Sequence, residues 1–137
     1  MKSLTIDRAD ELLKSLIRLY GKGGQSSTYS DYIFDSIAME KGDLKVFSLP
    51  NATYYIVFDP HYNNSFEKSK VCSEVGLENV PGLECDSVEL MNLVNDHVDC
   101  DLYVFNMEDQ LIAVGTHEDQ IQNGKRLMWH PRPIQKP

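Results

Sequence analysis

The sequence predicts a single α+β domain, in which an antiparallel sheet of four to five strands is packed by about three helices. Apolar residues recur at helical spacing within the first twenty positions, and short segments rich in β-branched and aromatic residues follow. Two of these segments are separated by a short polar loop, as in a β-hairpin. The length of 137 residues fits one domain, and no internal repeat or linker divides it.

Two helices are expected in the N-terminal part of the chain. The first begins after Thr5, a favourable N-cap residue, and ends before Gly21. The second is predicted over residues 30–41, where apolar side chains again follow a helical period.

A third helix is expected from Asp86 to Val98. Asp86 is followed three residues later by Glu89, which is the pattern of a capping box. Glu89, Asn92 and Asp96 then fall on one side and form a polar outer stripe.

Two strands are predicted at Leu44–Leu49 and Thr53–Asp59, with Pro50-Asn51 as the turn between them. Apolar and aromatic residues occupy both faces of the second strand, which is typical of a central strand covered on both sides. Residues 61–85 carry mainly turn signals, including Pro81-Gly82, and a short helical pattern over Ser65–Val75.

The clearest local pattern is a hairpin in the C-terminal third. Its strands are Leu102–Asn106 and Gln110–Thr116, and Met107-Glu108-Asp109 form the loop. A further short strand is expected at Arg126–His130, before the following prolines end it.

The charge is distributed unevenly along the chain. The net charge is −8, yet residues 1–70 contain nine basic and nine acidic residues. Residues 71–124 contain twelve acidic residues and no Lys or Arg, and the remaining four basic residues follow. This middle segment creates a negative potential that attracts cations and basic proteins.

The predicted hairpin gives this charge a location. If Asn106 pairs with Gln110, Asp101 lies opposite Gly115, at the end of the hairpin where the third helix also finishes. The acidic residues expected at this pole, with Glu89 at its rim, are Asp96, Asp99, Asp101, Glu118 and Asp119. Because clustered like charges reduce stability, their expected gathering at one pole favours a role in binding a basic partner.

Enzymatic alternatives rest on the same pole. His97, Cys100 and His117 lie among these carboxylates, so a small metal-dependent or acid–base hydrolase is the alternative function. The spacing matches no zinc, EF-hand or nucleophile motif, and we therefore predict no metal, no cofactor and no catalytic residue. The carboxylates would also suppress the thiolate of Cys100.

Composition excludes several other classes. The strand aromatics lack flanking Lys and Arg, which argues against direct nucleic-acid binding. The apolar runs are too short to span a membrane, and early acidic residues do not fit a signal peptide. Three scattered cysteines form a poor disulfide framework, so we expect a cytoplasmic protein.

The small acidic α+β domain, with the helix Asp86–Val98 leading into the hairpin Leu102–Thr116, resembles the bacterial immunity proteins of polymorphic toxin and contact-dependent growth inhibition systems. The resemblance covers size, charge and element order. It implies a non-enzymatic cytoplasmic inhibitor that binds one cognate toxin, often a basic nuclease, and covers its active site. It transfers no binding residue to this chain.

Overall fold

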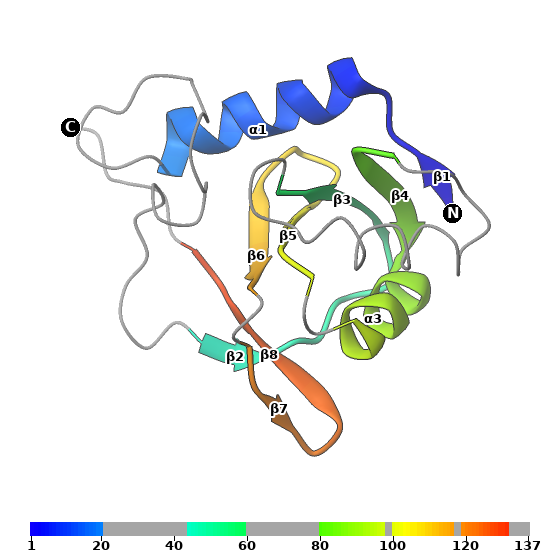
Figure 1. Ribbon diagram of the computed structural model, residues 1–137, viewed down its shortest axis with the longest axis vertical. Coiled ribbons are helices and arrows are strands. Elements are labelled where there is room, and N and C mark those ends of the chain that lie inside the picture. Colours follow the sequence, from blue (N-terminus) through cyan, green and yellow to red (C-terminus); the bar gives the residue numbers. More distant parts are fainter. Residues whose placement is uncertain (21–43, 60–79, 98–99, 117–118, 132–137) are drawn as a thin grey trace.

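A computed structural model of the chain describes residues 1–20, 44–59, 80–97, 100–116 and 119–131 (Figure 1). These residues form an α+β fold, as predicted from the sequence. The antiparallel sheet is larger than expected, however, with eight strands, and two helices lie within the described residues. The helix predicted over 30–41 and the helical pattern at 65–75 lie outside them.

The sheet has the order β1-β4-β3-β5-β6-β8-β2, and β7 pairs with β8 as a hairpin. All pairings are antiparallel. The strands are β1 (Lys2–Ser3), β2 (Leu44–Val46), β3 (Thr53–Phe58), β4 (Gly82–Asp86), β5 (Leu102–Phe105), β6 (Leu111–Gly115), β7 (Ile121–Gln122) and β8 (Lys125–Trp129).

The two helices pack on opposite faces of this sheet and create two hydrophobic cores. Helix α1 (Ile6–Tyr20) begins beyond Thr5, whose hydroxyl accepts from the Arg8 amide at 3.1 Å, and it buries one apolar stripe. Helix α3 (Ser87–Asp96) covers the other face. In Figure 1 the α1 helix and the β7–β8 hairpin lie at opposite ends of the molecule.

Strand β3 confirms the prediction of a central strand. It lies between β4 and β5, and its alternate side chains enter different cores. Tyr54, Ile56 and Phe58 pack with α3, whereas Val57 packs with α1. The partner of β2 is nevertheless β8, so the two strands flanking Pro50-Asn51 do not form a hairpin with each other.

The β5–β6 hairpin has the predicted three-residue loop. The Asn106 amide donates to the Gln110 carbonyl at 3.0 Å, and Asp109 adopts a left-handed conformation with φ 60°. The predicted register fails beyond the loop, because a β-bulge places Ile112 and Ala113 on the same side, toward α3. Leu102, and not Asp101, therefore pairs with Gly115.

Strand β4 was not predicted, since Pro81-Gly82 was interpreted as a turn. Gly82 is in fact a strand residue, at a place where the backbone of β3 passes very close. A Cβ at this position would lie 2.2 Å from the Ile56 carbonyl oxygen, so glycine is required by packing and not by a turn.

Within the described residues, no helix is both long and apolar enough to cross a membrane.

Candidate functional site

The acidic residues that were expected to form one exposed pole differ strongly in their access to solvent. Asp96 is exposed at the end of α3, and Glu89 lies near the start of the same helix. Asp101 is 2% exposed and Asp119 has a side chain that is 1% exposed, so both lie in the interior. Asp99 and Glu118 lie outside the described residues.

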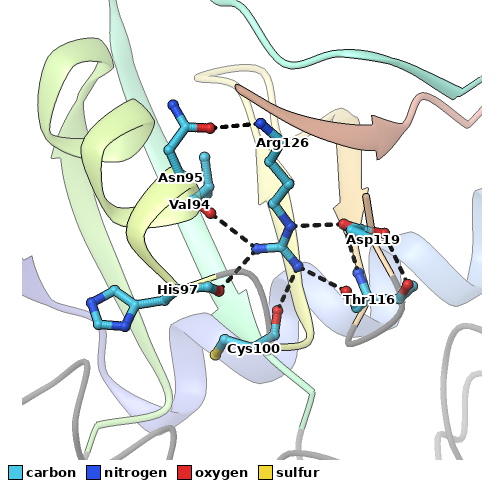
Figure 2. A network of polar contacts seen from close by, with 7 residues as sticks. All are labelled: Val94, Asn95, His97, Cys100, Thr116, Asp119 and Arg126. Carbon is cyan, nitrogen blue, oxygen red and sulfur yellow. Dashed lines mark hydrogen bonds and ion pairs between the residues drawn. The ribbon is translucent and has the colours of Figure 1, made fainter. Parts of the chain in front are cut away.

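Asp119 is buried because it pairs with Arg126 of β8. The Arg126 Nε donates to Asp119 Oδ2 at 2.8 Å, and neither side chain is accessible to solvent by more than 1% (Figure 2). The Asp119 carboxylate also accepts from the Thr116 amide and hydroxyl at 3.1 and 2.9 Å. Burial raises the pKa of Asp119, an effect that Arg126 and the two hydrogen bonds from Thr116 counteract.

The remaining donors of Arg126 are directed at main-chain carbonyl groups. Nη1 donates to Val94 and His97 at 3.4 and 3.2 Å, and Nη2 donates to Cys100 and Thr116 at 2.9 and 3.0 Å. All five guanidinium N–H groups thus have acceptors. Figure 2 shows Arg126 between the end of α3 on one side and the loop after β6 on the other.

This network replaces an ordinary C-cap for α3. The helix ends at Asp96, and its C-cap residue His97 has a φ of −129°, which is not the left-handed conformation found at many helix ends. Its last carbonyl groups are instead satisfied by Arg126, and the Arg126 amide in turn donates to Asn95 Oδ1 at 2.8 Å. The positive guanidinium is also favourable at the negative end of the helix dipole.

The exposed acidic residues that remain on this side belong to the outer side of α3. We define the α3 face by its solvent-accessible or partly accessible residues, Asp86, Val88, Glu89, Asn92 and Asp96. This agrees with the polar stripe predicted from sequence. Val88 is 66% exposed, so the face combines negative charge with one accessible apolar side chain.

The start of the α3 face is locally fixed. Asp86 accepts from the Glu89 amide at 2.8 Å, and Glu89 accepts from the Asp86 amide at 3.0 Å, which confirms the predicted capping box. The Met1 amino group lies 3.1 Å from Glu89. These hydrogen bonds, first that of the Asp86 amide, lower the pKa of Glu89.

Asp96 has the opposite relation to the helix. It occupies the last turn, where the helix dipole is negative and where α3 contains no basic residue. A carboxylate there reduces helix stability by about 0.3–1 kcal/mol. Its position is therefore not explained by the stability of α3.

Other reactive groups of the sheet are buried, on both of its faces. Asp59, 2% exposed, accepts a hydrogen bond of 2.6 Å from the Tyr103 hydroxyl. Cys85 and Cys100 are buried free thiols, and burial raises the pKa of Cys85 to about 12. The described residues contain no group of three or more His, Cys, Asp or Glu side chains that could hold a metal ion.

The sequence interpretation missed Arg126 as the partner of Asp119. The basic residues after position 124 were treated as a separate segment, but β8 returns beside β6 and brings one of them into the acidic region. A signal was present in the strand alternation. Arg126 shares a face with Met128, which is fully buried, so an inward-facing arginine could have been inferred.

Comparisons of the chain with protein-family models, with curated proteins and with solved structures find no match.

Proposed function

We propose that this chain is a non-enzymatic acidic binding protein that acts in the bacterial cytoplasm. Its partner is a basic protein such as the nuclease domain of a toxin, and it inhibits that partner by covering the active site. This is the role of the immunity proteins that the sequence resembles.

The observation that supports the proposal best is the α3 face. It presents Glu89 and Asp96 on a segment, residues 71–124, that contains no Lys or Arg. Opposed charge on two proteins raises the rate of association by roughly ten- to a thousandfold, and it orients the encounter. The unfavourable place of Asp96 on the helix is accounted for if the residue serves a partner.

The proposed contact surface is accordingly narrower than the pole expected from sequence. Glu89 and Asp96 remain in it, and the exposed Val88, next to Glu89 on the helix, supplies an apolar contact. Asp101 and Asp119 are assigned structural roles, because a partner could not reach them without unfolding the region around Arg126.

The test compares two pairs of substitutions that each remove two negative charges. Glu89→Gln with Asp96→Asn changes the α3 face, whereas Asp7→Asn with Glu108→Gln changes exposed acids on α1 and on the β5–β6 loop. Gln at position 89 still accepts in the capping box, so the first pair preserves α3.

The probe is the C-terminal domain of a secreted toxin encoded by the adjoining upstream reading frame, purified and mixed with each variant. The first pair should lower the association rate roughly three- to tenfold at low salt and flatten its salt dependence, with little effect of the second pair. Equal effects of both pairs would reject the α3 face, and the absence of any binding would reject the proposed function.

A further inference from the structure

An Asn–Gly pair stands at the tip of the β7–β8 hairpin, and it is the one such pair in the sequence. Asn123 has φ 53° and Gly124 has φ 78°, so these residues form a two-residue type I′ turn between Gln122 and Lys125. Both are exposed. A Cβ built on Gly124 would meet nothing within 4 Å, which shows that the main chain here is unobstructed.

We propose that Asn123 is a site of spontaneous modification, at which its carboxamide is converted to aspartate and isoaspartate. The main-chain nitrogen of Gly124 forms a bond to Asn123 Cγ, the Cγ–Nδ2 bond breaks, and ammonia leaves with the proton of that amide. Water then opens the five-membered succinimide at either carbonyl group. Glycine favours ring closure because no side chain obstructs its nitrogen.

The other hairpin of the molecule provides an internal reference. Asn106 Oδ1 accepts from the amides of Glu108 and Gln110 at 3.0 and 2.9 Å, and its Nδ2 donates to Gln110 Oε1 at 2.9 Å. These bonds restrict rotation of the Asn106 carboxamide, which ring closure onto the main-chain nitrogen of Met107 would require. The Asn123 side chain, by contrast, makes no hydrogen bond to another described residue.

The two products should affect the hairpin differently. Aspartate before glycine is also favoured in a type I′ turn, so the aspartate form keeps the pairing of Gln122 with Lys125. Isoaspartate adds a methylene group to the main chain, which a two-residue turn cannot accommodate without shifting β7 along β8. The bond of 2.8 Å from the Leu127 amide to the Gln120 carbonyl reports on this shift.

The first experiment incubates the folded, full-length protein at mildly alkaline pH and measures the remaining amide at every asparagine by peptide mass spectrometry. Asn123 should be lost before Asn106 and Asn95, with isoaspartate detected by isoaspartyl methyltransferase labelling. Asn123→Gln should strongly reduce the loss of amide at this position over the same incubation, since ring closure from glutamine is slower. Loss at Asn106 or Asn95 at an equal or greater rate than at Asn123 would overturn the proposal.

The second experiment measures hydrogen exchange of the Leu127 amide. Exchange should be unchanged in Asn123→Asp and faster in the purified isoaspartate fraction. Equal protection of the Leu127 amide in the aspartate and isoaspartate forms would overturn the proposed shift of β7 along β8. The assignment of Asn123 as the modified residue is tested separately, by the first experiment.

Discussion

Two arginine–aspartate pairs join distant segments of this chain, and they differ mainly in their access to water. In the Arg126–Asp119 pair the side chains are 0% and 1% exposed, whereas in the Arg8–Asp109 pair they are 28% and 37% exposed. Both have short contacts, of 2.8 and 2.6 Å. Similar geometry therefore occurs in two environments with very different electrostatic consequences.

The surroundings of each pair explain what it contributes. Arg8 connects α1 to the tip of the β5–β6 hairpin, also pairs with Glu11, and lies 5.0 Å from the centre of the Tyr55 ring. Water screens most of its Coulomb energy, and such pairs contribute up to about 1 kcal/mol. The buried Arg126 guanidinium has lost its hydration. Its charge is therefore stabilised by hydrogen bonds to four carbonyl groups as well as by Asp119.

The largest effect is expected from Arg126→Met. It leaves Asp119 as a buried carboxylate without its cation and removes the donors of four main-chain carbonyl groups. We expect a loss of roughly 3–5 kcal/mol in the free energy of unfolding, measured by urea denaturation. Arg126→Lys should lose almost as much, because an ammonium group has three donors and cannot reproduce the planar fork.

A double variant separates the ion pair from the carbonyl bonds. Arg126→Met with Asp119→Leu removes both charges, yet it still leaves four carbonyl groups without donors and the Thr116 amide and hydroxyl without their acceptor. If the double variant recovered wild-type stability, the hydrogen bonds to the carbonyl groups would make no net contribution to the free energy of unfolding. The Arg126–Asp119 pair would then resemble the buried ion pairs that apolar residues can replace without loss of stability.

The second effect concerns Gly115 of β6. A Cβ there would lie 2.7 Å from Arg126 Nη2 and 2.9 Å from its Cζ, and the guanidinium is fixed by five hydrogen bonds. Gly115→Ala should therefore reduce stability by roughly 1–3 kcal/mol through overpacking. The same substitution in the Arg126→Met background should cost clearly less, and additive costs would show that Arg126 is not the obstructing group.

The comparison also explains how far sequence reasoning reached. Local signals predicted α1, the capping box of α3, the alternation of β3 and the loop of the β5–β6 hairpin, because each depends on neighbouring residues. The bulge at Ile112 has no comparable local signal, and it shifted the predicted register by one residue.

The candidate site was harder to predict than the fold, because charge was assigned by position in the sequence. Asp119 and Arg126 are seven residues apart, yet a turn of the chain and the β7–β8 hairpin bring them together in the interior. Glu89 and Asp96 were predicted correctly as outward-facing because the helical period alone decides that. On a helix, the periodicity of the sequence thus decides whether an acidic residue is exposed. Outside the helices, tertiary contacts decide it, and these could not be read from the sequence.

A smaller effect is expected for the surface pair. Arg8→Met should reduce stability by less than about 1 kcal/mol, because water solvates Asp109 once the guanidinium is removed. Raising the salt concentration should shrink this loss further, while the loss caused by Arg126→Met should stay nearly constant. Equal salt sensitivity of the two variants would contradict the assignment of one pair to the interior.

The smallest effect is expected at Glu89, whose pKa is lowered by the Asp86 amide and by the Met1 amino group. A carboxylate with a folded-state pKa below its unfolded value, about 4.3, stabilises the fold above that pH and loses this contribution as the pH falls through the folded value. Because the side chain is 36% exposed, solvent screening limits the contribution to a few tenths of a kcal/mol.

Glu89→Gln should therefore be slightly less stable than the wild type at neutral pH, and the difference should disappear as the pH is lowered below about 4. Urea denaturation across this range measures the difference, with Glu108→Gln as an exposed control on the β5–β6 loop. A difference that persisted at low pH would mean that the amide fails to replace the carboxylate in the capping box. The stability difference between the wild type and Glu89→Gln would then arise from the hydrogen bond to the Asp86 amide and not from the charge of Glu89. Glu89 would in that case not serve as an example of a solvent-screened charge.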